Sequence, residues 1–313
     1  MSSLRPERIL RGHRAHISSG KFLAYPFIAT GSSDGVVKLW KTTSFKNIST
    51  IQAHPDSSLI SLTSFNSGNS FLTQGRDSLV KTWDINQGSP QCSNALTTNS
   101  LHSFCKLGLS KDNKIIAISG NDPNVLEFWD YTSQENIHSI KSTKNGMVMS
   151  VTFSDPNSNK ICIGYENGMV NILDLRTYEA VSSRKNHSQP VLAVCMNTGG
   201  TIGVSCSADP ENLKFSILET KIEIIDKFQA NTPGFASLVL RSDEKILGSC
   251  GWDKRIRIFS CKRNLKQLAI LKFHKETVND LDFLIANEKE LILAVSKDKR
   301  AAIWNIDYSW LIK

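Results

Sequence analysis

Histidine and aspartate, side chains often used for proton transfer, recur at regular positions in this sequence. Four histidines lie 27 to 30 residues before the end of a repeated segment, namely His13, His54, His187 and His274. The run Gly31-Ser32-Ser33-Asp34-Gly35 also matches the G-x-S-x-G pattern of a nucleophile elbow. That elbow requires a turn from a strand into a helix, whereas the residues after Gly35 are typical of a strand. The pattern therefore does not indicate a hydrolase.

Other residue patterns that would support catalysis or ligand binding are missing from the sequence. Seven cysteines are scattered along the chain without a C-x-x-C pair, which favours buried thiols in a reducing compartment over disulfides, zinc or redox use. The sequence has no phosphate-binding glycine loop and no H-E-x-x-H helix. It therefore predicts a protein that is not an enzyme and that needs no metal or cofactor.

A repeated segment runs from one end of the chain to the other. Four copies place an aromatic residue six positions after a turn Asp: Asp34 to Trp40, Asp77 to Trp83, Asp253 to Phe259 and Asp298 to Trp304. Three weaker copies end at Trp129, Leu173 and Ser216. The seven marker positions, 40, 83, 129, 173, 216, 259 and 304, are separated by 43 to 46 residues. This period is typical of repeats that form one four-stranded sheet each.

The residues within each repeat favour strands over helices. Apolar and polar residues alternate with period two, as in Val148 to Phe153, and Gly, Asn and Asp mark the turns. Seven such sheets predict an all-β fold, a seven-bladed β-propeller that forms one domain over residues 1–313. The last marker lies nine residues before the end of the sequence, so residues 8–10 are expected to supply the missing outer strand of the last sheet.

One polar stretch interrupts the regular pattern between the second and third repeats. Residues 86–100 are rich in Asn, Ser, Gln and Thr, and we expect an extended loop or a displaced outer strand there. A solvated connector is the favoured interpretation, and a partner-binding motif is the alternative.

The repeats resemble the WD-repeat family, whose Gly-His signature is present as Gly12-His13. More specific stretches resemble the G-protein β-subunit-like 1 family, called ASTRA-associated protein 1 in fungi. These stretches are Ile9 to Ile17, Gly164 to Gly168, Gly251 to Phe259, Leu268 to His274 and Val278 to Asp280.

The WD resemblance implies a structural role for the recurring His and Asp residues. In that family a His, the turn Asp, a strand Ser or Thr and the Trp form a hydrogen-bonded chain inside each blade, and such a satisfied network rigidifies the turn. Ala294 stands where the strand hydroxyl is expected in the last repeat. The predicted network residues are His13, Thr30, Asp34, Trp40, His54, Thr73, Asp77, Trp83, Asp253, His274, Asp298 and Trp304.

The narrower resemblance implies a non-enzymatic scaffold subunit of the ASTRA assembly. Such a subunit would support chromatin remodelling and the maturation of PI3-kinase-like kinases. Its expected partners are ASTRA subunits, the Triple-T co-chaperone and those kinases, and its expected location is the nucleus, with the cytoplasm also open. A heterotrimeric G-protein β-like subunit and a ubiquitin-ligase substrate receptor are the alternatives. No run of about 18 apolar residues and no secretory signal appear, so neither a membrane partner nor secretion is expected.

Positive charge is concentrated at the two ends of the sequence. Residues 21–240 carry 18 basic and 18 acidic residues, so the formal charge of +8 comes from residues 1–20 and 241–313. In a WD propeller the turn after each Asp and the loop with each His share one face. Nine cations are therefore expected on one rim: Arg11, Arg14, Lys254, Arg255, Lys272, Lys275, Lys297, Lys299 and Arg300.

Two interpretations of this rim stay open. It is either a solvated basic edge, partly neutralised by Asp253 and Asp298, or a docking site for an acidic protein segment. Direct nucleic-acid binding is not expected, because no aromatic platform is interleaved with the cations.

Overall fold

A computed structural model describes residues 4–86, 88–98, 100, 103–262, 264–286 and 289–306. These residues form 28 strands and two short 3-10 turns, η1 (Asn66–Gly68) and η2 (Pro156–Ser158), and contain no α-helix. In the described part of the chain, no helix has the length and apolar character needed to cross a membrane.

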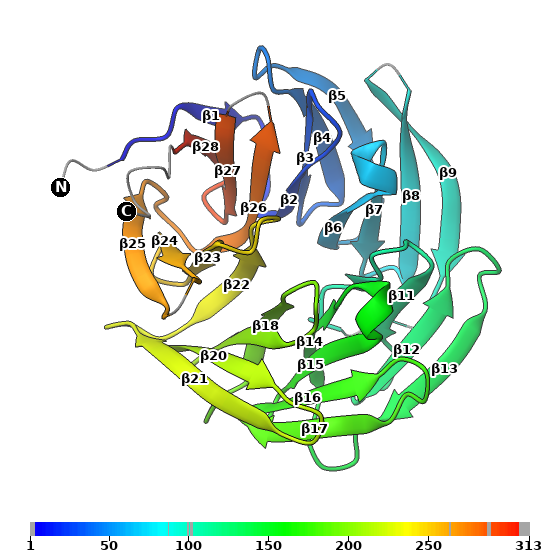
Figure 1. Cartoon of the computed structure of the whole chain (residues 1–313). Helices are drawn as coiled ribbons and strands as arrows, with labels where there is room; N and C mark the ends of the chain where they lie inside the picture. Colours follow the sequence, from blue (N-terminus) through cyan, green and yellow to red (C-terminus); the bar gives the residue numbers. More distant parts are fainter. Residues whose placement is uncertain are drawn as a thin grey trace. The chain divides into compact units, whose positions relative to one another are not determined.

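The strands assemble into seven four-stranded sheets, one for each repeat (Figure 1). Those of the first three repeats are β2 (Ile17–Phe22), β3 (Phe27–Ser32), β4 (Val36–Lys41) and β5 (Asn47–Gln52); β6 (Leu59–Phe65), β7 (Ser70–Gly75), β8 (Leu79–Asn86) and β9 (Ser89–Thr97); and β10 (Gly108–Leu109), β11 (Ile115–Ser119), β12 (Val125–Asp130) and β13 (Asn136–Lys141).

The next three repeats give β14 (Val148–Phe153), β15 (Lys160–Tyr165), β16 (Met169–Asp174) and β17 (Ala180–Lys185); β18 (Val191–Met196), β19 (Ile202–Ser207), β20 (Glu211–Ile217) and β21 (Ile222–Gln229); and β22 (Phe235–Leu240), β23 (Ile246–Gly251), β24 (Arg255–Ser260) and β25 (Lys266–Lys272). The seventh sheet has the order β1 (Arg8–Arg11), β28 (Arg300–Asn305), β27 (Lys289–Ser296) and β26 (Val278–Ala286). Seven such sheets confirm the predicted class, an all-β seven-bladed β-propeller, and we number the blades in marker order.

The chain divides into two compact units. The first comprises residues 1–97, 241–260 and 267–313, and so contains blades one, two and seven together with β23, β24 and most of β25. The second comprises residues 98–240 and 261–266, with blades three, four and five and strand β22. The single domain over residues 1–313 stays a prediction.

Strand β1 completes blade seven, as the sequence predicted. It pairs antiparallel with β28, so that Arg8 lies opposite Ile303 and Arg11 opposite Arg300. Leu10 is 2% exposed and packs with Ile17, Leu293 and Ile303 in one apolar cluster. The first strand of the chain therefore seals an edge that would otherwise be open.

Burial follows the position of each strand in its blade. All six residues of β23 are buried, whereas five of the six residues of the outer strand β13 are exposed. Central strands have apolar neighbours on both faces, and outer strands face water on one side. This difference explains why the markers, which lie on central strands, carry the clearest apolar pattern.

The polar stretch after blade two is mostly a strand. Ser89–Thr97 forms β9, which pairs with β8 from Asn86 opposite Ser89 to Leu79 opposite Thr97. The outer-strand alternative therefore holds there, and the choice between a solvated connector and a partner-binding motif stays a prediction. Pro90 is tolerated because an outer strand has no partner on its second edge. Residues 87 and 99 lie outside the described part of the chain.

Candidate functional site: histidine networks and a basic rim

Blade two contains the full hydrogen-bonded chain expected from the sequence. The Nδ1 atom of His54 lies 2.9 Å from Asp77 Oδ2, and its Nε2 atom lies 2.9 Å from Thr73 Oγ1. The indole N–H of Trp83 donates to the same Thr73 oxygen at 3.0 Å. His54 is fully buried, so both ring nitrogens and the hydroxyl are engaged inside the blade.

Blade one differs from this arrangement by one inserted hydroxyl. His13 Nε2 lies 2.7 Å from Thr30 Oγ1, and Trp40 donates to that oxygen at 2.8 Å. The Nδ1 atom of His13 meets Ser32 Oγ at 2.8 Å, and Ser32 in turn donates to Asp34 at 2.5 Å. Asp34 therefore reaches the histidine only through Ser32. Ser32 directly precedes Ser33, the central residue of the apparent nucleophile elbow, and its hydroxyl also lies 3.1 Å from the carbonyl of Val36.

Blade seven lacks the hydroxyl that joins His to Trp in the other two blades. His274 Nδ1 lies 3.0 Å from Asp298, but its buried Nε2 atom has no partner among the described residues. Ala294 occupies the position of Thr30 and Thr73, ten residues before the marker tryptophan. The Trp304 indole donates to the Leu4 carbonyl at 3.3 Å instead.

We expect the substitution Ala294→Ser to stabilise the protein. The new hydroxyl would donate to Nε2 of His274 and accept from the Trp304 indole, so the free energy of unfolding should rise by about 1 kcal/mol. The control is Ala301→Ser, which puts a hydroxyl into the apolar cluster around Leu10 and should destabilise the protein. Urea unfolding measures both variants, and equal losses of stability would contradict the predicted hydrogen bonds.

Blade six uses an arginine where the other networks use a histidine. Asp253 forms an ion pair with Arg257, whose side chain is 4% exposed, and also accepts from the backbone N–H of Arg255 at 3.2 Å. Blade five, in the second unit, again has a histidine: His187 lies 3.0 Å from Asp209 and 2.9 Å from Ser205 Oγ. The spacing of the repeats identified His187 and Asp209 as repeated positions, but it did not predict a role for Arg257.

Burial keeps the histidines of the first two blades neutral. It lowers the pKa of His13 to about 4, and the nearby Lys38 ammonium lowers it further, against the weaker pull of Asp34. Burial also lowers the pKa of His54 even though Asp77 favours the protonated ring. A neutral His54 donates its Nδ1–H to Asp77 as a hydrogen bond rather than as an ion pair. Both rings are structural groups that water does not reach freely.

The lowered pKa of His13 predicts a loss of stability in acid. The unfolded chain takes up a proton near pH 6.5 and the folded chain only near pH 4, so the stabilisation is present above pH 6.5 and is lost as the pH falls toward 4. Between pH 7 and pH 5 the loss should be about 2 kcal/mol.

The variant His13→Gln lacks this titration, so its stability deficit against the wild type should shrink as the pH falls from 7 to 5. Urea unfolding at both pH values measures the deficit. A deficit that does not change with pH would contradict the assignment.

The nine predicted cations lie at one end of blades six, seven and one. Strand β1 ends at Arg11 opposite Arg300, the first residue of β28, and the turn of residues 297–299 joins β27 to β28 at this same end. Arg14 follows in the segment that leads to β2. His16, in that segment, lies 2.6 Å from the carbonyl oxygen of Lys297, which ties it to the turn of blade seven.

The remaining cations lie beside these elements. Lys254 is in the turn between β23 and β24, and Arg255 begins β24. Lys272 ends β25, and Lys275 lies between β25 and the start of β26. All belong to the first compact unit. We call the following nine residues the basic rim: Arg11, Arg14, Lys254, Arg255, Lys272, Lys275, Lys297, Lys299 and Arg300.

The side chains of the basic rim are open to solvent. Seven of the nine residues are exposed, and Arg255 and Arg300 are half-buried. Within the described part of the chain, none of the nine side chains forms an ion pair. Asp253 is paired with Arg257, and Asp298 accepts from His274 and from the backbone N–H groups of Lys275 and Arg300. The positive charge of the basic rim is therefore not neutralised by ion pairs, and it produces a positive potential at this surface.

A buried ion cluster also joins blades one and seven. Lys21 Nζ lies 3.6 Å from Asp280 and 4.0 Å from Asp282, and Ser19 donates to Asp280 at 2.6 Å. Burial raises the pKa of Asp282 to about 6, against the opposing effect of the Lys21 charge. These residues bind one another across two blades, and we assign them to stability.

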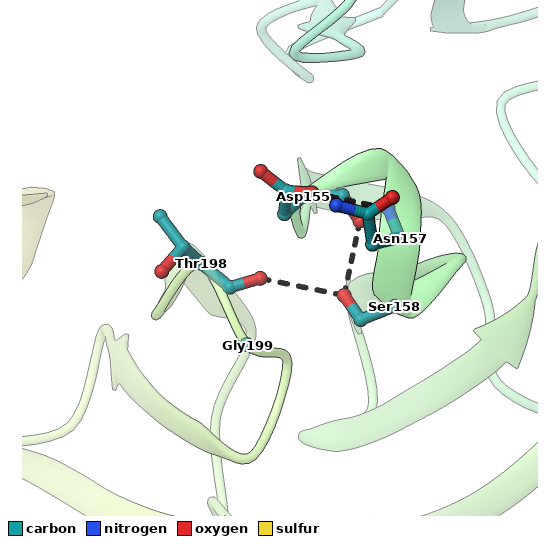
Figure 2. Close-up of a pocket in the computed structure, with 5 residues that line it drawn as sticks. All are labelled: Asp155, Asn157, Ser158, Thr198 and Gly199. Carbon is teal, nitrogen blue, oxygen red and sulfur yellow. Dashed lines mark hydrogen bonds between the residues drawn. The ribbon is translucent and has the colours of Figure 1, made fainter.

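A shallow polar hollow in the second unit was not anticipated from the sequence. It encloses about 350 Å³ and is lined by Asp155, Asn157, Ser158, Thr198 and Gly199 (Figure 2). The Ser158 hydroxyl already lies 3.0 Å from the carbonyl of Asp155 and 3.3 Å from that of Thr198. The lining offers no histidine, cysteine or lysine, and no group of three metal-ligating side chains occurs among the described residues of the chain. The hollow does not assemble a catalytic site.

Seven four-stranded blades, with buried networks of His, Asp, Thr and Trp in blades one and two, define a WD-repeat β-propeller. The chain belongs to the family described as "Mediator complex subunit 16, N-terminal", whose model matches residues 8–202.

Proteins of known name match the whole length. The chain is 26% identical to "Guanine nucleotide-binding protein subunit beta-like protein 1" of Mus musculus, with 96% of each chain covered. It is also 26% identical to "ASTRA-associated protein 1" of Schizosaccharomyces pombe and of Schizosaccharomyces japonicus, with 96% of this chain and 98% of each relative covered. These matches confirm the narrower resemblance drawn from the sequence.

Proposed function

We propose that this chain is a non-enzymatic scaffold subunit of the ASTRA assembly. The observation that carries the proposal is the end-to-end match to fungal proteins named for their association with ASTRA. Because the match covers 96% of this chain and 98% of the relative, it involves the whole propeller rather than a few shared blades. We infer that association with ASTRA is shared by this chain and the relatives named ASTRA-associated protein 1, and is not a property of one relative alone.

The arrangement of polar groups supports a scaffold over an enzyme. The histidines and aspartates that suggested acid–base chemistry hydrogen-bond to one another inside their blades, as in His54, Asp77 and Thr73. General acid–base catalysis needs a group that reaches the substrate proton, and fully buried His54 does not. The exposed turns remain available for other proteins.

We extend this proposal to a more specific role in the cell. As an ASTRA subunit, the chain would work in the nucleus with the Triple-T co-chaperone and with PI3-kinase-like kinases during their maturation, and so support chromatin remodelling. Several faces on one β-propeller suit a subunit that holds two partners at once. Its partners would be proteins, and neither membranes nor nucleic acid would bind it directly.

Affinity purification of the tagged full-length chain from its own cells, followed by mass spectrometry, tests the proposal. Recovery of ASTRA subunits, the co-chaperone and the large kinases is the expected result. Recovery of a G-protein γ subunit or of a cullin adaptor would overturn it in favour of a G-protein β-like subunit or a ubiquitin-ligase substrate receptor. The tag alone, expressed at the same level, serves as the control.

The family description gives a second candidate, a subunit of the Mediator complex. The model described as Mediator complex subunit 16, N-terminal, matches residues 8–202, which include the first four blades. The same purification separates the two candidates, because Mediator subunits would then be recovered in place of ASTRA subunits.

A further inference from the structure

An exposed tryptophan lies in the blade-six turn of the basic rim. Trp252 is 49% exposed and sits in the turn between β23 and β24, directly before Asp253 and Lys254. It is the one exposed large apolar side chain among the described residues of the turns and connections that carry the rim. The sequence predicted no aromatic platform among these cations, and Trp252 is a single exposed aromatic side chain beside them. Tryptophan and arginine are the residues most enriched at the energetic centres of protein interfaces.

Two lysines of the rim occupy a backbone conformation that favours glycine. The residue after the turn Asp or Asn has a positive φ in blades one, two, four, six and seven. Blades one and four use Gly35 (φ 75°) and Gly168 (φ 87°), and blade two uses Ser78 (φ 62°). Blades six and seven use Lys254 (φ 67°) and Lys299 (φ 65°). A side chain in this left-handed region costs stability, and such strain is concentrated at functional positions. Of the three strained positions, the two in blades six and seven add charge to the rim.

We propose that the basic rim, together with Trp252, binds an acidic linear segment of a partner protein that carries an apolar or aromatic residue. Carboxylates of the segment would pair with the exposed lysines and arginines, and its apolar residue would pack on the Trp252 indole. This inference rests on the proposed scaffold function and names the chemistry of one partner.

Charge complementarity selects the acidic segment. Residues 11–16, 252–255, 272–277 and 297–300 contain nine cations and three acids. Of these acids, Asp253 and Asp298 are hydrogen-bonded within the protein and only Glu276 is exposed. Single-stranded nucleic acid binds on several aromatic platforms in a row, but the rim offers one. A membrane surface would need a broad apolar face, which one indole does not supply.

The test uses the full-length protein and a fluorescein-labelled peptide of twelve residues, ten Glu with two central Phe. Fluorescence anisotropy should show binding to the wild type that weakens from 50 to 300 mM salt. The variant Lys254→Gly/Lys299→Gly should bind roughly fivefold more weakly while its melting temperature stays equal or rises, because glycine relieves the strained turns.

A matched control removes the same charge elsewhere. Lys41 and Lys46 are exposed and lie at the other end of blade one, so Lys41→Ala/Lys46→Ala should leave peptide affinity within about twofold of the wild type. Trp252→Ala should weaken the Phe-containing peptide roughly tenfold and a peptide of twelve Glu much less.

Any of the following results would overturn the proposal that the basic rim binds an acidic segment. Failure of the acidic peptide to bind at 1 mM would do so, as would equal losses in the rim variant and the Lys41/Lys46 control. Tighter, Trp252-dependent binding of a twelve-nucleotide single-stranded DNA would assign the rim to nucleic acid, and tighter binding to phosphatidylserine vesicles would assign it to a membrane. Peptide binding measured in this way does not depend on which assembly is recovered from cells, so failure of the ASTRA proposal is seen separately.

Discussion

Deletion of residues 1–11 is expected to lower the free energy of unfolding by about 4 kcal/mol or more. The deletion removes β1, so the N–H and C=O groups of β28 that face Arg8 to Arg11 lose their partners. It also uncovers the apolar cluster in which Leu10 is 2% exposed. The contacts of Glu7 N–H with the Ile303 carbonyl, at 2.7 Å, and of Trp304 with Leu4 disappear as well.

Urea unfolding followed by tryptophan fluorescence measures this loss, and light scattering should show that the opened edge promotes association. Arg8→Ala is the control. Arg8 is exposed and its guanidinium carbon lies 5.5 Å from the centre of the Phe45 ring, so its loss should cost about 1 kcal/mol or less. A truncated protein with the unfolding midpoint of the wild type would show that β1 does not hold blade seven together.

The second large effect is expected from Gly35→Ala, at about 3 kcal/mol or more of destabilisation. Gly35 has a φ of 75°, and its carbonyl accepts from the N–H groups of Ala53 and His54. A Cβ atom at this position would overlap the carbonyl oxygen of His54 and lie 2.7 Å from that of Ser57. Both are backbone atoms, so the connection that carries His54 would have to move and the network of blade two would lose its geometry.

Gly199→Ala is the matched control for this substitution. Its Cβ would have the Asn197 side chain as nearest neighbour at 3.7 Å, and Gly199 has no positive φ. The control should be neutral or slightly stabilising, because alanine restricts the unfolded chain. Thermal and urea unfolding of both variants provide the measurement. A Gly35→Ala protein as stable as Gly199→Ala would mean that the turn of blade one is not packed against the connection to blade two.

The sequence by itself determined the strand content, the seven sheets and the closing role of residues 8–10. These features depend on local signals, namely turn residues, alternation of apolar and polar positions, and a marker spacing of 43 to 46 residues. The resemblance to the WD-repeat family predicted that His54 contacts Thr73 and Asp77, and the structure confirms both contacts. For β9 the signal was weak, since an outer strand that faces water can be rich in Asn, Ser and Gln.

Only the tertiary structure decided which side chain completes each hydrogen-bonded network and which side chains near the basic rim are exposed. Ser32 enters between His13 and Asp34, and Arg257 takes the place of a histidine opposite Asp253. Both choices depend on which donor reaches a buried acceptor in three dimensions, and the repeat period carries no information about that. The sequence likewise assigned no role to Trp252, which is exposed in the turn between β23 and β24. Strand pairing also brings Arg11 beside Arg300, residues 289 positions apart in the chain.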